Sequence, residues 1–290
     1  MKTSVFHFRF TTPAVFCSLL LSTFFISCSK NEAVLSPADD TGVTSKITEQ
    51  IQPASLMGFW KFNGNTKDAS GHGHHGLLKQ GHAYFGAGLP VLTTDRFGQA
   101  NKAYHFDHGG NIEVPYSSAL NPQQMSISIW CKKSIVGRTV NPDTYTMVSL
   151  NRWNGYKVQY QSANKIFFTV KAVNGTDTIY YDRDDEVAVL DNEVWYHAVV
   201  TFKPGAISFY INGDLVKKWT DTPGSAITLA TPINFCIGQD LPTDKYLTVD
   251  GDFQVAWGGF FTGDLDDVMF FNAALNAGQV KAIFDSQKTL

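Results

Sequence analysis

The stretch that decides the fold is Leu56-Met57-Gly58-Phe59-Trp60-Lys61-Phe62-Asn63-Gly64-Asn65, an apolar strand that ends in glycine and amide side chains. A second stretch near the other end of the chain has the same character: Phe261-Thr262-Gly263-Asp264-Leu265-Asp266-Asp267-Val268-Met269-Phe270-Phe271. The two stretches bracket one β-rich region. We therefore expect the first and last strands of this region to lie side by side.

The composition favours an all-β domain. The chain has 290 residues, which leaves room for one sizeable domain or two small ones with a large buried core. Hydrophobic residues make up 43% and charged residues only 17%, and Gly, Asn and Thr are plentiful. The formal net charge of −3 gives no electrostatic reason to bind nucleic acid or an anionic membrane surface.

The N-terminus is predicted to be a targeting segment. A positively charged start precedes an apolar run over residues 15–27 that is too short to span a bilayer comfortably. The run ends in Phe25-Ile26-Ser27-Cys28, which resembles a bacterial lipobox, so residues 1–27 are expected to be a lipoprotein leader and Cys28 the lipidated residue. The alternative is an ordinary signal peptide. Residues 28–54 lack the apolar content to fold and are interpreted as a flexible tether.

Period-2 alternation recurs through the rest of the chain. In Met125–Cys131, the side chains of Ile127, Ile129 and Cys131 take one face of a strand. Asn212-Gly213 separates two further apolar runs and predicts a hairpin, because both residues tolerate positive φ. The segment 194–202 is apolar on both faces, as in a central strand. Further strands are predicted over residues 145–150, 157–161, 165–173, 178–181 and 233–238.

One short helix is predicted at the C-terminus. Asn276 and Gln279 have capping-box spacing, and Val280, Ile283 and Phe284 form one apolar stripe. Many short strands with polar turns and a single terminal helix indicate an all-β, two-sheet antiparallel sandwich over residues 55–290.

Two cysteines remain in this domain, Cys131 and Cys236. Both lie in apolar strand patterns, where buried thiols are common. Two buried thiols are favoured, and a disulfide stays open because sequence does not supply the separation of the two Cα atoms.

Four blocks of sequence, in order, resemble the LamG-like jelly roll of the concanavalin A-like lectin and glucanase superfamily. They lie in residues 58–76, in 95–114, in 125–130 with 195–197 and 210–213, and in 263–275. The resemblance covers about residues 55 to 288 and implies a concanavalin A-like jelly roll. The family includes sugar-binding and adhesion modules, so the fold alone does not decide the function.

The resemblance also implies a structural calcium ion. In this superfamily such an ion joins an aspartate of the last strand to oxygen atoms near the first strand, which here points to Asp266 with Asn63 and Asp68. Asp266 is in phase with Val268 and Phe270, and a carboxylate among apolar neighbours requires a partner. Calcium accepts such oxygen ligands. The alternative is that Asp68 caps a turn while Asp266 accepts backbone N–H bonds.

The histidine-rich segment His72-Gly73-His74-His75 raises a zinc hypothesis. Adjacent His74 and His75 do not readily face one tetrahedral ion. Histidine in place of asparagine in an exposed turn is the favoured interpretation.

No catalytic residues are predicted. Glucanases of the superfamily carry three alternating acids on one strand, which places a general acid and a nucleophile on one face. The glutamates of this domain are Glu113, Glu186 and Glu193, and none is two residues from another acid along a clear strand. Asp182, Asp184 and Asp185 are interpreted as a solvated loop. The chain is therefore expected not to be an enzyme.

Sugar binding requires aromatic faces beside a few polar groups. Trp153, Tyr156, Tyr246 and Trp257 are the candidates, the last two within a long insertion over residues 241–260. The alternative is that these rings cover the ends of the core.

The predicted function is non-catalytic carbohydrate binding by a lipid-anchored protein of the bacterial cell envelope, in the periplasm or on the outer surface. A module that binds a protein partner is the second hypothesis, and a glycoside hydrolase is the third.

Overall fold

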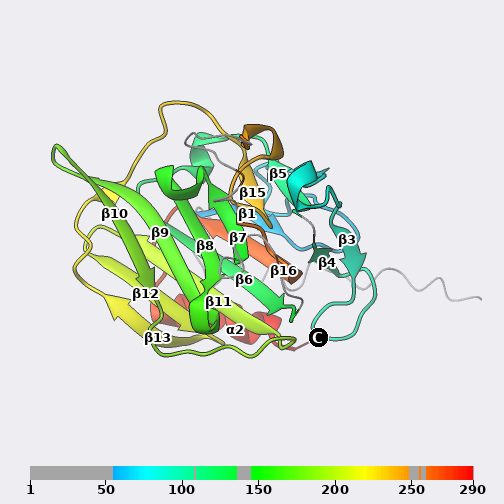
Figure 1. Cartoon of the computed structure of the whole chain (residues 1–290). Helices are drawn as coiled ribbons and strands as arrows, with labels where there is room; N and C mark the ends of the chain where they lie inside the picture. The colour runs from blue at the N-terminus through cyan, green and yellow to red at the C-terminus, as the bar shows by residue number, and fades with distance from the viewer. Residues whose placement is uncertain (1–54, 108, 136–144, 248–254, 256–258, 290) are drawn as a thin grey trace, which may run out of the picture. The chain divides into compact units, whose positions relative to one another are not determined.

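The protein folds as two stacked antiparallel β-sheets with one C-terminal helix (Figure 1). The computed structural model describes residues 55–107, 109–135, 145–247, 255 and 259–289. The predicted leader, the tether and Cys28 lie outside these residues. No helix in the described ranges is long and apolar enough to cross a membrane.

Sheet A joins the two ends of the domain. Its strands, in spatial order, are β13 (Asp214–Trp219), β12 (Ala206–Ile211), β11 (Tyr196–Lys203), β6 (Met125–Lys133), β16 (Gly263–Phe271), β4 (Ala103–Phe106) and β3 (Val91–Thr93), and β1 (Leu56–Trp60) also pairs with β16. The β1–β16 pairing is antiparallel and sets Trp60 opposite Val268. The prediction that the first and last strands lie side by side is confirmed.

Two local predictions for sheet A are also confirmed. β12 and β13 form the expected hairpin, with Asn212 at φ 52° and Gly213 at φ 85°. β11 lies between β6 and β12, as its apolar faces indicate.

Sheet B carries the remaining strands. In order they are β10 (Asp177–Asp184), β9 (Lys165–Asn174), β8 (Tyr156–Gln161), β7 (Tyr145–Leu150), β15 (Phe235–Ile237), β5 (Asn111–Val114) and β2 (Leu77–Lys79), and β14 (Ser225–Ala226) pairs with β9. The interpretation of Asp182 and Asp184 as loop residues is wrong. All eight residues of β10 pair with β9, and the ring of Tyr181 packs into the core while Tyr180 and Asp182 on either side of it are exposed.

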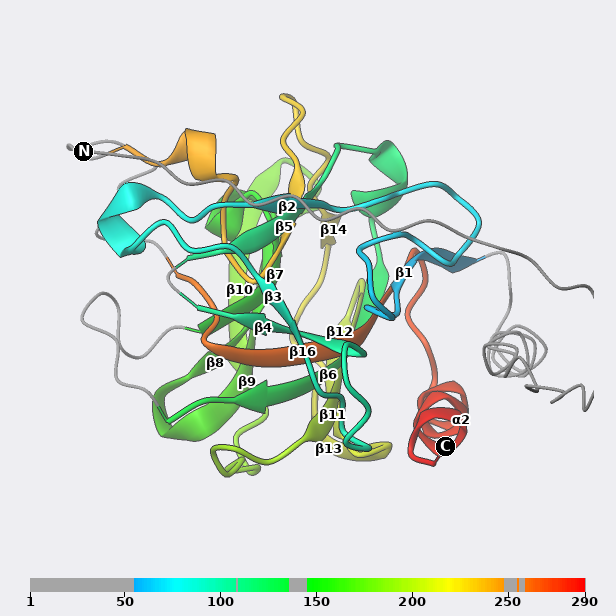
Figure 2. The same cartoon turned by 90° about the vertical axis from the view of Figure 1, so that its right-hand side faces the viewer.

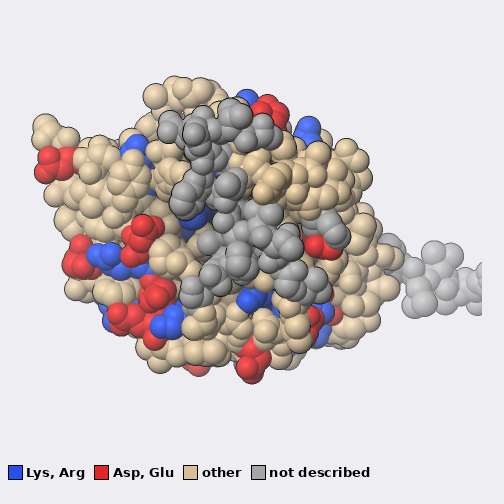
Figure 3. Space-filling model, in the orientation of Figure 1, with Lys and Arg blue, Asp and Glu red and all other residues tan. Residues whose placement is uncertain are grey.

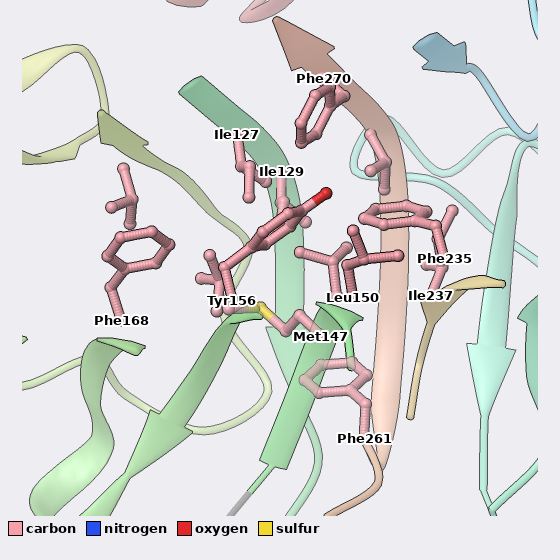
Figure 4. Close-up of a cluster of buried hydrophobic side chains, with 14 of the residues drawn as sticks. Ile127, Ile129, Met147, Leu150, Tyr156, Phe168, Phe235, Ile237, Phe261 and Phe270 are labelled. Atoms are coloured by element: carbon pink, nitrogen blue, oxygen red, sulfur yellow. The ribbon is translucent and has the colours of Figure 1, made fainter. Parts of the chain in front are cut away.

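The core lies between the two sheets. Figure 4 shows Ile127 and Ile129 of β6 facing Tyr156 of β8 and Phe168 of β9 across this layer. The alternation predicted for β6 is confirmed, because Ile127, Ile129 and Cys131 all belong to the core. Cys131 and Cys236 are both buried free thiols, on different sheets. Burial raises the pKa of Cys131 to about 12, which leaves this thiol unreactive at neutral pH.

The C-terminal helix α2 (Ala277–Gln287) covers the outer face of sheet A. Asn276 and Gln279 form the predicted capping box. Val280 and Ile283 join a second apolar cluster with residues of β1, β11, β12 and β16. The ring of Phe284 stacks on Trp130 at 5.8 Å between centroids, so this outward residue of β6 is buried as well.

Candidate functional site

A bulge in β16 changes where Asp266 points. The pairing with β6 shifts register between Asp266 and Met269, and Asp267 has a φ of 45°. Leu265 and Val268 both belong to the core, so the bulge breaks the alternation between them. The expectation that Asp266 is in phase with Val268 is therefore wrong. Asp266 points to the opposite side of the sheet.

On that side Asp266 forms a buried ion pair with Arg96. Nη2 of Arg96 also lies 2.8 Å from Oδ2 of Asp267, and Nε donates to the carbonyl of Gln287 at 3.1 Å. The guanidinium lies 4.5 Å from the centroid of the Trp130 ring. Burial, with the adjacent charge of Asp267, raises the pKa of Asp266 although Arg96 opposes the shift. This cluster fixes the end of α2 on sheet A.

Asp68 fastens the segment after β1. Oδ1 accepts hydrogen bonds from the backbone N–H groups of Phe59 and Ser70 at 2.9 and 2.8 Å, and Oδ2 accepts from the N–H of His74 at 2.9 Å and the hydroxyl of Ser70 at 2.8 Å. Burial alone raises the pKa of Asp68, but these hydrogen bonds outweigh it and hold the pKa below its ordinary value.

The two carboxylates of the predicted calcium site, Asp68 and Asp266, both have protein partners in this structure. The calcium site stays a prediction. A rise in melting temperature when calcium is added to chelator-treated protein would establish it, and an unchanged melting temperature would remove it.

The histidines after β1 have structural partners. Nδ1 of His74 lies 2.6 Å from the carbonyl of Met57, and Nδ1 of His75 accepts the backbone N–H of Asp68 at 3.1 Å. The first contact ties the turn to β1 (Leu56–Trp60), and the second closes the turn on itself.

The four aromatic candidates do not form one site. Tyr156 is 1% exposed and its hydroxyl donates to the carbonyl of Leu120 at 2.5 Å, so it is a core residue (Figure 4). Tyr246 is also buried, with its hydroxyl bonded to Asp240. These two proposed contact residues are corrected to core positions, because each ring is enclosed by apolar neighbours. Trp153 is half-buried. Trp257 lies outside the described residues.

Sequence reasoning missed a buried ion pair beside Trp153. Arg152 opens the short 3₁₀-helix η4 (Arg152–Asn154), and its Nε lies 2.8 Å from Oδ2 of Asp240. Both side chains are at most 1% exposed. The guanidinium lies 4.7 Å from the centroid of the Trp153 ring and 5.3 Å from that of Tyr246. The partners are 88 residues apart, so no local pattern indicated the pair.

The outward face of β9 and β10 interleaves aromatic and polar side chains. We call this surface the β9–β10 strip: Phe167, Thr169, Lys171, Tyr180, Asp182 and Asp184. Across the two strands Phe167 is opposite Asp184, Thr169 opposite Asp182, and Lys171 opposite Tyr180. The hydroxyl of Thr169 donates to Asp182 at 2.7 Å, and Nζ of Lys171 lies 5.1 Å from the Tyr180 ring centroid.

At one end the strip opens into a hollow of ≈ 610 Å³ at the edge of the sandwich, between β10 and β13. Its lining residues are Lys165, Phe167, Asp182, Arg183, Asp184, Glu186 and Trp219. Figure 3 shows acidic and basic side chains alternating over this region, at the left of the view. The indole N–H of Trp219 donates to the carbonyl of Asp184 at 2.9 Å, and the Arg183 guanidinium lies 4.9 Å from the Trp219 ring centroid. These contacts hold the side chains of Trp219 and Arg183 in place in the wall of the hollow.

The carboxylates of the hollow have the spacing of a paired-acid site but not its surroundings. Asp182 and Asp184 point to the same face of β10, about 7 Å apart by strand geometry. Asp182 and Glu186 are exposed, and Glu186 forms an ion pair with Lys217. A general acid requires a carboxyl in apolar surroundings. Asp185, next to the lining residues in sequence, is buried, and burial raises its pKa to about 6, but it accepts hydrogen bonds from the N–H groups of Ile166 and Ala188 and so anchors a loop.

Comparison with known proteins agrees with this architecture. A family model described as the concanavalin A-like lectin/glucanases superfamily matches residues 106–281. No curated protein matches the chain in sequence.

Among solved structures, domain 4 of AbnA, an extracellular GH43 arabinanase from Geobacillus stearothermophilus in complex with arabinotriose, is 18% identical, with a TM-score of 0.56 over 79% of this chain and 98% of that domain. The binding domain of Paraclostridial Mosquitocidal Protein 1 is 17% identical, with a TM-score of 0.55 over 81% of this chain and 52% of that one. The binding domain of botulinum neurotoxin DC, in complex with rat synaptotagmin II, is 15% identical, with a TM-score of 0.51 over 81% of this chain and 52% of that one. This chain spans about half of each of the two toxin domains.

Proposed function

Because the chain belongs to the concanavalin A-like lectin/glucanases superfamily, we propose that it is a non-catalytic carbohydrate-binding module. Its ligand lies in the hollow and along the β9–β10 strip. The observation that carries this proposal is the combination, in one preformed hollow, of aromatic surface with polar side chains of both donor and acceptor type. The bound arabinotriose of the arabinanase domain supports the ligand class.

The chemistry of the hollow suits a sugar ring. Sugars present C–H faces that pack on aromatic rings and hydroxyls that both donate and accept hydrogen bonds. Phe167 supplies a half-buried ring at the mouth of the hollow, and Tyr180, 48% exposed, supplies a second ring farther along the strip. In this proposal Asp182 and Asp184 accept hydrogen bonds from hydroxyl groups of the sugar, and the ammonium group of Lys165 donates a hydrogen bond to a sugar hydroxyl.

Replacing Phe167 or Tyr180 by alanine is expected to weaken glycan binding about tenfold each, because each change removes about 1.4 kcal/mol of stacking. A glycan array that includes arabinan oligosaccharides identifies the ligand, and affinity electrophoresis in gels of the retained polysaccharide measures the loss. Tyr84→Ala is the matched control, since Tyr84 is 57% exposed at the far edge of the sandwich. Equal retardation of all three variants would contradict the assignment of the site.

The non-catalytic part of the proposal has its own test. The exposed acids of the hollow lack the apolar surroundings of a general acid, so no release of reducing sugar is expected from any polysaccharide that the protein binds. If the wild-type protein releases reducing sugar, and the Asp182→Asn or Glu186→Gln variant does not, the protein is a glycoside hydrolase.

A protein ligand is the second candidate. The neurotoxin binding domain with the same fold is in complex with synaptotagmin II, which is the observation that favours it. If the protein captures one protein partner and binds no glycan on the array, this alternative is established.

The location forms part of the same proposal. We propose that Cys28 carries acyl chains that hold the protein to the cell envelope. Mass spectrometry of the N-terminal peptide of the mature protein tests this: an acylated Cys28 is expected, and a free N-terminus elsewhere would contradict it.

A further inference from the structure

A second hollow lies at the opposite end of sheet B from the β9–β10 strip. Its volume of ≈ 540 Å³ is within the range of small-molecule sites. The end strand β2 pairs here with β5, and Figure 2 shows the two strands side by side near the top of the view. We call this hollow the β2–β5 hollow, and its lining residues are Leu78, Lys79, Gln80, Leu89, Glu113, Asn234, Thr243 and Asp244.

Thr243 fixes the wall of the β2–β5 hollow. It opens the 3₁₀-helix η6 (Thr243–Lys245), and its Oγ1 donates to the carbonyl of Gln80 at 2.8 Å and accepts from Nδ2 of Asn111 at 3.0 Å. Its backbone N–H donates to Oε1 of Glu113 at 3.1 Å. These bonds join η6 to β5 and to the end of β2, so the hollow is formed without a ligand, as small-molecule sites usually are.

Glu113 is a buried carboxylate in the lining of this hollow. It is 5% exposed, and its neighbour Ile112 belongs to the core, so Glu113 points to the outward face of sheet B. Besides the N–H of Thr243 it accepts Nδ2 of Asn234 at 3.0 Å. Both donors are neutral, and within the described ranges no Lys, Arg or His forms an ion pair with Glu113. A carboxylate has about four acceptor positions, and a buried charge is stabilised by an opposite one, so Glu113 suits a positively charged group of a ligand.

Lys79 supplies the opposite charge on the same face of the sheet. It is opposite Asn111, while Glu113 is opposite Leu77, so the Cα atoms of Lys79 and Glu113 are diagonal neighbours roughly 7–8 Å apart. Lys79 is exposed and forms no ion pair with any residue that the structure describes. The hollow therefore contains one anion and one cation that do not neutralise each other.

The rest of the lining narrows the class of ligand. None of the lining residues is aromatic, whereas sugars pack their C–H faces on aromatic rings, so the β2–β5 hollow is unlike the proposed sugar site. Leu89, 47% exposed, supplies an aliphatic surface instead. Asp244 already has a cationic partner, because Nζ of Lys245 lies 3.0 Å from its Oδ2.

We propose that the β2–β5 hollow binds an α-amino acid with an aliphatic side chain. The ammonium group of the ligand donates to Glu113, and its carboxylate accepts from the ammonium group of Lys79. The aliphatic side chain packs on Leu89. One zwitterion thus gives each of the two charges in the hollow a partner. The inference does not depend on sugar binding at the β9–β10 strip.

An NMR titration of the ¹⁵N-labelled protein with three probes tests the inference. L-leucine carries both charges, N-acetyl-L-leucine lacks the ammonium group, and L-leucinamide lacks the carboxylate. L-leucine is expected to shift the backbone amides of Glu113 and Thr243 saturably, and each analogue is expected to bind about tenfold more weakly because it loses one ion pair. If L-leucine causes no saturable shift, the inference is overturned. If L-leucinamide binds as tightly as L-leucine, the hollow takes a cation alone, such as the N-terminus of a peptide, and the inference is overturned as well.

The variant Lys79→Met separates the carboxylate contact from the rest of the site. Lys79 is exposed on an end strand, so the fold is expected to tolerate the change. The affinity for L-leucine is expected to fall about tenfold, and the affinity for L-leucinamide is expected to stay that of the wild type. Lys218→Met, at an exposed position of β13, is the matched control and is expected to bind L-leucine like the wild type. Unchanged binding of L-leucine to Lys79→Met would overturn the inference and leave the proposed sugar site untouched.

Discussion

Replacing Arg152 by methionine is expected to lower the free energy of unfolding by about 3–5 kcal/mol. The change leaves the carboxylate of Asp240 buried at 1% exposure without its cationic partner. The hydroxyl of Tyr246 still donates to Asp240, but one neutral donor does not compensate a buried charge. Urea denaturation followed by intrinsic fluorescence measures the effect.

Two further variants make this prediction specific. Arg183→Met breaks a pair with Asp221 whose side chains are 23% and 60% exposed, so a loss below about 1 kcal/mol is expected. The double variant Arg152→Met/Asp240→Leu removes both charges and is expected to be more stable than Arg152→Met alone. A double variant as unstable as the sum of its single changes would show that the ion pair is not the cause.

Trp60→Ala is expected to destabilise the protein by a similar amount, about 3–5 kcal/mol. The Trp60 side chain is fully buried, stacks on the ring of Phe235 at 5.5 Å between centroids, and donates its indole N–H to the carbonyl of His74 at 2.8 Å. Trp60 therefore joins β1 of sheet A to β15 of sheet B and to the turn after β1. Its loss opens a cavity where the two ends of the domain meet.

The control for this effect is Leu92→Ala on the exposed edge strand β3, which is expected to change stability by less than about 0.5 kcal/mol. Thermal unfolding of both variants gives the comparison. If the Trp60→Ala variant has the same melting temperature as the wild type, the role of the β1–β16 pairing in closing the sandwich is contradicted.

Much of the fold follows from local sequence because its signals are local. The Asn212-Gly213 turn, the alternation in β6 and the Asn276 capping box each depend on a few adjacent residues, and each is present in the structure. The pairing of β1 with β16 was predictable because matching apolar stretches stand at both ends of the domain.

The site was less predictable because its geometry depends on contacts between distant residues. The bulge at Asp267 turned Asp266 towards Arg96, 170 residues away, where an uninterrupted strand would have directed it into the core. Tyr156 and Tyr246 have polar neighbours in sequence, yet their rings complete the core. The strip was missed because the acids of β10 suggested a loop. The alternation of Ile179 and Tyr181 with Tyr180 and Asp182 is the signal that identifies a strand with an outward polar face.

The most direct test of sugar binding at the β9–β10 strip is an NMR titration of ¹⁵N-labelled protein with the oligosaccharide that the glycan array retains most strongly. Shifts are predicted for the backbone amides of β9 and β10 and for the indole N–H of Trp219. Saturable shifts confined to other elements, with β9 and β10 unmoved, would contradict the account.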